Sequence, residues 1–385
     1  MADSSLIIGV IGTIIILGAL FLVLANKKKI PIVLPLLVLG IILGPVTKLF
    51  DPIKFSQVIN VLVTFALVIV IFEAGNTVNL TRLKSQALVF TSLSLIGPLI
   101  IISIVSLFSY VFLNIRAELA ILLGALLSST DPTIMRPILE SFGRKLENIK
   151  NIINLESMLN SVVAVVFVIV ISNLLILKQR TGFAGAIKIF MYQIFLGVGM
   201  GVVFGYLIYR IICKFKEEVK THILTLGAIL LLYGVTNLVG GSGIISVLIL
   251  GAIFANLKPA PPRIIKSFGG ELELLLLIFV YVILGTFLGV ELTFINVAII
   301  FFVVILVLLS RYVAVYISAS VKSRGERNIL FLGGGKGVVC SVLALSSAPL
   351  FPNPELVLNI IFSVVLVTTL IASFVPIFFL DRLMK

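Results

Sequence analysis

The sequence predicts an all-α polytopic membrane protein, and three observations lead to that prediction. Hydrophobic residues make up 60% of the 385-residue chain and charged residues only 12%, about half the charge of a typical soluble domain. Mean hydropathy is +1.29. Apolar runs of roughly 18 residues or more, long enough to cross a bilayer, recur along the chain. A soluble protein has no core that could hide so many apolar helices.

We expect about thirteen spans, joined by short loops into a single membrane domain. No soluble domain or long linker interrupts them, and the ninth span is short. The expected spans are residues 5–25, 30–49, 56–75, 86–113, 117–140, 149–177, 183–213, 219–239, 243–257, 270–290, 294–320, 328–349 and 356–381.

Basic residues in the loops predict the orientation of the chain. The loops on one side of the bilayer carry about 20 Lys and Arg residues and those on the other about 6. The richer side should be cytoplasmic, so an odd number of spans places the N-terminus outside and the C-terminus inside. The opening MADSSLIIGV lacks the basic region of a signal peptide. The same distribution explains the net charge of +13 as a topology signal, and we expect no nucleic-acid partner.

A few ionisable residues lie inside expected spans and are candidates for function, because a charge in hydrocarbon is costly. The alternative is an ion pair between helices that serves structure only. Two cysteines and a single His favour neither a disulfide framework nor a metal centre. The candidates are Glu73, Asp131, Arg136, Glu156, Arg311 and Lys336.

Two expected spans contain interruptions. In the fifth span, SSTDPTIMRP places Asp131 before Pro132, with Pro137 five residues on; proline cannot donate a backbone hydrogen bond, so the helix should break there. In the twelfth span, FLGGGKGVVC surrounds Lys336 with four glycines. A phosphate loop is excluded because Gly337, not Ser or Thr, follows the lysine. Close helix packing is the alternative explanation for the glycines.

The positions of these interruptions predict inverted repeats. The fifth and twelfth spans are seven apart, so they cross the bilayer in opposite directions. Interrupted helices in corresponding positions of two inverted repeats indicate a transporter binding site near the midplane. Spans four to six would then correspond to spans eleven to thirteen.

Arg311 and Glu156 are expected to form an ion pair. Arg311, in LLSRYVAVYIS, needs an anion in the apolar interior, and Glu156, in NLESMLNSVV, needs a cation there. Glu156 would then be scaffold rather than proton carrier. Spacings of three and four residues place Ser157, Asn160 and Ser161 on one side of the sixth helix.

Four motifs, together with the number of spans, resemble the monovalent cation/proton antiporter superfamily in its NhaP-type sodium/proton exchanger branch. They are FEAG where that family has FEGG, TDP, ESMLNS where it has ESLLND, and GGKGVV where it has GxRGVV. The resemblance covers almost the whole chain. It implies a secondary transporter, not an enzyme, that serves pH homeostasis in a prokaryotic plasma membrane. It also implies a homodimer whose protomers each contain two crossed broken helices.

The resemblance also implies how the chain divides and which residues form the ion site. A transport core would comprise about residues 86–177 and 294–381 with the third span, and a dimerisation part about 1–50 and 183–290. Thr130, Asp131 and Ser157 should line the Na⁺ site, and Asn160 should hold it together. Glu156 and Arg311 should support it, and Glu73 is a candidate for a gating or structural role. Lithium and potassium remain alternatives to sodium, and no cofactor beyond the transported ions is expected.

Two departures from the family pattern leave two functions open. Ser161 replaces the principal ion-binding aspartate, and a hydroxyl ligates cations but does not carry protons near neutral pH. Lys336 replaces an arginine, which keeps the charge but loses the planar fork. Asp131 could be the remaining site of cation/proton competition, giving electroneutral exchange. Alternatively, the chain is a transport-impaired member or an engineered Asp-to-Ser variant: a locked transporter, a sensor or an accessory subunit.

A remote alternative is an intramembrane serine protease. GGSG at Gly240 to Gly243 matches the GxSG of rhomboid-type proteases. His222 precedes Ser242, however, where that family's catalytic His follows the serine. A Gly-rich turn between two spans is the favoured explanation.

Overall fold

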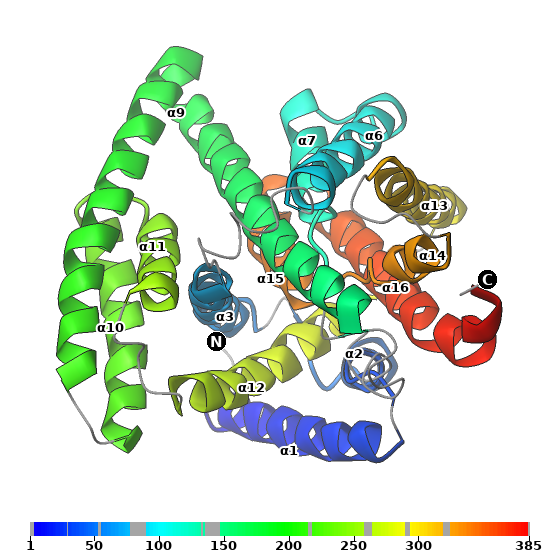
Figure 1. Cartoon of the computed structure of the whole chain (residues 1–385), viewed down its shortest axis with the longest axis horizontal. Helices are drawn as coiled ribbons and strands as arrows, with labels where there is room; N and C mark the ends of the chain where they lie inside the picture. The colour runs from blue at the N-terminus through cyan, green and yellow to red at the C-terminus, as the bar shows by residue number, and fades with distance from the viewer. Residues whose placement is uncertain are drawn as a thin grey trace. The chain divides into compact units, whose positions relative to one another are not determined.

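The computed structural model describes residues 4–28, 30–52, 55–77, 90–131, 134, 147–214, 218–257, 264–288, 293–318 and 324–383. All regular structure in these ranges is helical (Figure 1). Seven helical segments there are long and apolar enough to cross a membrane, and six shorter apolar helices accompany them. The predicted all-helical membrane class is confirmed, whereas the number of spans stays a prediction.

The described helices follow one another in a simple order. They are α1 (Ser4–Lys28), α2 (Val33–Ile41), η1 (Ile42–Val46), α3 (Ser56–Thr77), η2 (Phe90–Ile96), α6 (Gly97–Phe112), α7 (Ala117–Leu126), α9 (Glu147–Lys214), α10 (Glu218–Leu238), α11 (Gly243–Asn256), α12 (Ile264–Thr286), α13 (Phe294–Ile317), α14 (Arg324–Leu332), α15 (Val338–Ser347), η4 (Ala348–Leu350) and α16 (Pro354–Leu383).

Local sequence explains where helices begin and bend. Thr293 caps α13 by accepting a hydrogen bond from the N–H of Asn296, and Ser242 caps α11 in the same way. Inside the long helix α9, Gly182 has a φ of 74°, which favours glycine. Helix α9 therefore consists of two helices that meet at a kink there, and Figure 1 shows α9 as two arms. Two apolar segments result, Ile152–Lys178 and Ala184–Ile212, where the sequence predicts its sixth and seventh spans.

The chain forms two compact units. The first comprises Met1–Thr64, Leu88–Ala164 and Leu276–Lys385. Within it, α6 packs against α7 and α13, and α16 contacts α13, α14 and α15. The second comprises Phe65–Ala87 and Val165–Leu275, and within it α10 packs against α11. The functional division into a transport core and a dimerisation part stays a prediction.

Glycines allow very close helix approach in both units. In the first unit, a Cβ on Gly40 of α2 would lie 2.8 Å from the Cα of Gly285 on α12. In the second, a Cβ on Gly251 of α11 would lie 2.8 Å from the backbone N of Asn76, which follows Gly75 on α3. Real Cβ atoms essentially never come so close to backbone atoms. The two helix pairs therefore pack backbone against backbone, as small residues permit in membranes.

Two of the non-helical segments in the first unit lie inside expected spans, the fifth and the twelfth. Helix α7 ends at Leu126, and residues 127–131 that follow it are not helical. Helices α14 and α15 are separated by non-helical residues 333–337, the glycine-rich stretch around Lys336. Pro132, Arg136 and Pro137 lie outside the described residues. The course of the fifth span beyond Asp131, and the crossing of two broken helices, therefore stay predictions.

Candidate functional site

The two non-helical segments are hydrogen-bonded to each other through Asp131. The N–H of Asp131 donates to the carbonyl oxygen of Gly335 over 2.9 Å. In return, the N–H of Val338 donates to Oδ2 of Asp131 over 3.0 Å. Val338 is the first residue of α15, so the Asp131 carboxylate lies at the N-terminal end of that helix. Free N–H groups and the helix dipole favour a negative charge there.

The glycines around Lys336 leave room for their neighbours. A Cβ on Gly337 would collide with the carboxyl group of Asp131. A Cβ on Gly334 would collide with the side chain of Arg311, with 2.6 Å to Nε. The glycine-rich stretch therefore has both roles that the sequence suggested: it interrupts the helix, and it permits close packing.

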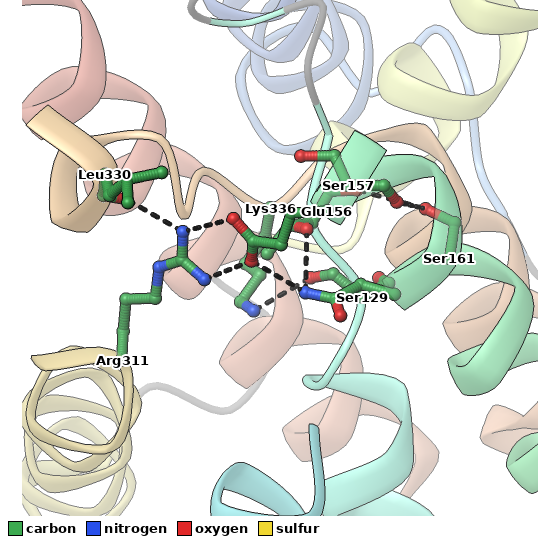
Figure 2. A network of polar contacts seen from close by, with 9 residues as sticks. Ser129, Glu156, Ser157, Ser161, Arg311, Leu330 and Lys336 are labelled. Carbon is green, nitrogen blue, oxygen red and sulfur yellow. Dashed lines mark hydrogen bonds and ion pairs between the residues drawn. The ribbon is translucent and has the colours of Figure 1, made fainter. Parts of the chain in front are cut away.

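Arg311 and Glu156 form an ion pair inside the first unit (Figure 2). Nη2 of Arg311 donates to Oε2 of Glu156 over 2.8 Å and to the carbonyl oxygen of Leu330 over 2.7 Å, while Nη1 binds Oε1. Both side chains are almost fully buried, with 3% exposure for Arg311 and none for Glu156. Two-point contact between guanidinium and carboxylate is the strongest form of such a pair. Glu156 thus has a permanent cationic partner.

Asn160 and Ser161 join α9 to the non-helical segment after α7. Nδ2 of Asn160 donates to Oε1 of Glu156 over 2.9 Å and to Oγ1 of Thr130 over 3.2 Å. The Ser161 hydroxyl has two carbonyl acceptors, Thr130 O at 3.0 Å and Ser157 O at 2.8 Å. The structure therefore brings Thr130, Ser157, Asn160 and Ser161 together beside the ion pair.

Two buried oxygens in this group lack a hydrogen-bond partner. Within the described part of the chain, Oγ of Ser157 and Oδ1 of Asn160 are buried and unbonded. Buried polar atoms in native proteins are nearly always satisfied, so exceptions call for an explanation. Hydroxyl, amide and carboxylate oxygens are the ligands that hard cations prefer. We name Thr130, Asp131, Ser157, Asn160 and Ser161 the oxygen cluster.

Lys336 is the fourth buried charge of the site. Its side chain has no exposed surface. Its Nζ donates to the carbonyl oxygen of Ser129 over 2.8 Å (Figure 2). Its backbone N–H donates to Oγ1 of Thr368 on α16 over 3.0 Å. Ser129 and Thr368 were not predicted from the sequence. Thr368 accepts through its side-chain hydroxyl, and a hydroxyl inside an apolar span could have suggested it. Ser129 accepts through its backbone carbonyl, which leaves no signal in the sequence.

The remaining candidates belong to the second unit. Glu73 is half-buried on α3, in the second unit, and its proposed gating role stays a prediction. Ser242 is the N-cap of α11, and Gly240 before it has a φ of 81°. GGSG thus forms the turn between α10 and α11. The side chain of His222 is outside the described residues.

Comparison with known proteins identifies the family. The sequence profile described as "Sodium/hydrogen exchanger, transmembrane" matches residues 12–381. The chain belongs to the sodium/hydrogen exchanger family. The resemblance drawn from the four motifs is therefore confirmed, and the family consists of transporters, which decides against the intramembrane protease.

Two relatives of this exchanger-family chain are antiporters by name. It is 27% identical to the Na⁺/H⁺ antiporter NhaG of Bacillus atrophaeus over 378 residues, covering 92% of this chain and 70% of the relative. It is 28% identical to the K⁺/H⁺ antiporter NhaP2 of Shewanella oneidensis, covering 90% of this chain and 62% of the relative. The solved structure of the sodium proton antiporter MjNhaP1 from Methanocaldococcus jannaschii matches with a TM-score of 0.80 and 22% identity, covering 98% of both chains. That likeness shows the fold.

Proposed function

We propose that this chain exchanges a monovalent cation, Na⁺ or K⁺, for protons across a prokaryotic plasma membrane by alternating access. Membership of the sodium/hydrogen exchanger family supports this function. The names of two relatives, a Na⁺/H⁺ and a K⁺/H⁺ antiporter, support these cations. The observation on which the proposal rests is the oxygen cluster, where two buried oxygens without partners lie beside Thr130 and the Glu156–Arg311 pair.

In this proposal the cation binds among Thr130, Asp131 and Ser157. Asn160 and Ser161 hold these groups together and present further oxygens. A carboxylate can make proton and cation compete, because it is neutral when protonated and an oxygen ligand when ionised. Alternating access then exposes the site to each side of the membrane in turn.

The proposed exchange is electroneutral. Glu156 is paired with Arg311 and does not take part. Asp131 is then the single carboxylate of the cluster that carries a proton, so one proton crosses for each cation. The Val338 N–H donates to Oδ2 of Asp131 at the N-terminal end of α15, an environment that suits a carboxylate acceptor. When Asp131 is protonated, that hydrogen bond weakens, which would couple its protonation state to the contact between the two non-helical segments.

The proposed architecture has thirteen spans and two crossed broken helices. Each expected span overlaps one of the seven long or six shorter apolar helices in the described residues. We also propose an external N-terminus, a cytoplasmic C-terminus, and a homodimer formed through the first span and the spans near seven to nine. Loop charge and the resemblance to the family support these proposals.

The test is proton flux in liposomes containing the purified protein. With an imposed pH gradient, addition of Na⁺ or K⁺ should collapse the gradient for the wild type and for the control Lys188→Met, which changes an exposed lysine of α9. Asp131→Asn should abolish cation-driven proton flux, because an amide does not exchange protons. Full proton-coupled flux in Asp131→Asn would remove Asp131 from its proposed role.

A transport-impaired protein is the second candidate, and Ser161 favours it. Its hydroxyl donates to backbone carbonyls at a position where the resemblance predicts a carboxylate. Ser161→Asp distinguishes the two candidates in the same assay. A large gain in pH-dependent flux supports a locked or impaired chain, whereas unchanged flux supports Asp131 acting alone.

A further inference from the structure

The non-helical segment after α7 presents two consecutive backbone carbonyls to the site, each with a different donor. The carbonyl of Ser129 accepts from the Lys336 side chain at 2.8 Å. The next carbonyl, that of Thr130, accepts from the Ser161 hydroxyl at 3.0 Å. Ser129 and Thr130 are both almost fully buried, with 1% exposure each. One carbonyl therefore faces a long basic side chain and the other a neutral hydroxyl.

The two carbonyls differ in how easily they can be released. The Ser161 hydroxyl carries one proton and has a second acceptor, Ser157 O, at 2.8 Å. It can turn to that acceptor and leave Thr130 O open without losing a hydrogen bond. Lys336 is anchored at both ends, since its backbone N–H is bound to Thr368 and its Nζ to Ser129. Ser129 O is therefore held far more firmly.

Carbonyls at this place would attract cations. Ser129 lies three residues beyond the C-terminal end of α7, where the helix dipole gives negative potential. Backbone carbonyls exposed by non-helical segments in membranes are common cation ligands. We propose that the ammonium group of Lys336 is a tethered cation that occupies Ser129 O and directs the transported cation to the Thr130 side of the segment.

The charges of the site support this role. Asp131 and Glu156 are balanced by Arg311 and Lys336 when all four are ionised. A transported cation therefore enters a neutral group and meets the positive charge of Lys336. This repulsion keeps cation affinity low, which favours release on the far side of the membrane. A neutral side chain at this position should leave one negative charge in excess, and Met should also free the Ser129 carbonyl, so the cation should bind more tightly.

This inference deepens the proposed function, and apparent affinity tests it. The Michaelis constant for Na⁺ and for K⁺ would be measured at one pH in liposomes with Lys336→Met, Lys336→Gln and Lys336→Arg. Both neutral variants should lower the Michaelis constant by about ten-fold. The repulsion between two nearby unit charges at an intermediate dielectric is large enough to account for a change of this size. Lys336→Arg keeps the charge and should stay within about two-fold of the wild type. Lys188→Met is the control for loss of a lysine.

A purely structural lysine predicts a different pattern. The neutral variants would then lose turnover or thermal stability while the Michaelis constant stayed unchanged, and that result would overturn the proposal. Failure of both neutral variants to fold, with a folded Lys336→Arg, would also overturn it. Lys336→Gln is included because its amide keeps a donor for Ser129 O while removing the charge.

Cation-dependent thermal stabilisation of the detergent-solubilised protein separates this inference from the proposed function. If the wild type transports no protons, the exchange proposal fails. A rise in melting temperature with Na⁺ or K⁺ that is larger in Lys336→Met than in the wild type would still support the tethered cation. An equal rise in both proteins, or none in either, would contradict it.

Discussion

At the scale of single residues, the sequence predicted the charges of the site better than their contacts. Asp131, Glu156, Arg311 and Lys336 were conspicuous because charges are rare in apolar spans. Arg311 and Glu156 could be matched because each requires an opposite charge. The acceptors Leu330 O, Gly335 O and Ser129 O were not foreseeable, since every residue has a carbonyl and only the folded backbone decides which one is offered.

Removing Arg311 should destabilise the protein strongly. Arg311→Met leaves Glu156 buried and unpaired, which should lower the free energy of unfolding by about 3–5 kcal/mol. The loss would be measured as a lower melting temperature in detergent. Adding Glu156→Gln should recover part of it, because no buried charge then lacks its partner. A double variant no more stable than Arg311→Met would contradict the pairing as the cause.

Gly337 should tolerate no side chain. Gly337→Ala places a methyl group against the carboxyl group of Asp131, so it should disrupt the contact between segments 127–131 and 333–337. We expect loss of transport and a lower melting temperature. Gly227→Ala on α10 is the matched control, because a Cβ there meets nothing within 4 Å. Equal behaviour of the two variants would refute the steric account.

At the scale of helices, apolar runs predicted where helices lie but not how they pack. Span boundaries followed from hydropathy, and Gly182 divides α9 where a loop was expected between the sixth and seventh spans. The close approach of α2 and α12 could not be predicted, because Gly40 and Gly285 are ordinary glycines in apolar runs. Their function depends on a partner helix more than 200 residues away in the sequence.

The contact between α2 and α12 should depend on both glycines. Gly285→Ala should force the helices apart and lower stability by about 1–3 kcal/mol, the usual cost of overpacking. Gly12→Ala on α1 is a suitable control, since its Cβ would meet open space. Thermal unfolding in detergent measures both. Equal melting temperatures for Gly285→Ala and the wild type would show that the helices can separate without cost.

At the scale of the whole molecule, class and family were predictable from the sequence, whereas the arrangement of the parts was not. Composition set the membrane class, and four short motifs in order identified the exchanger family. Hydropathy and motifs carry no information on how one compact unit is placed against another. The proposed transport core, dimerisation part and homodimer therefore depend on the resemblance alone.

Orientation can be tested with single cysteines. In a background with Cys213 and Cys340 replaced by serine, Lys48→Cys should react with a membrane-impermeant maleimide added to intact cells. Lys214→Cys should react only after the membrane is opened, because positive loops are cytoplasmic. Both positions are exposed. The reverse pattern would invert the proposed topology.

The central claim is that cation/proton exchange takes place at the oxygen cluster, and the Michaelis constant of an Asn160 variant tests it most directly. Asn160→Ala removes an unbonded buried oxygen, Oδ1, and the Nδ2 donor to Thr130 and Glu156, while both partners of the Glu156–Arg311 pair remain. We predict that the constant for the transported cation rises by about ten-fold, the effect of losing roughly 1.4 kcal/mol. Cation-driven proton flux by Asn160→Ala with an unchanged Michaelis constant would contradict the claim.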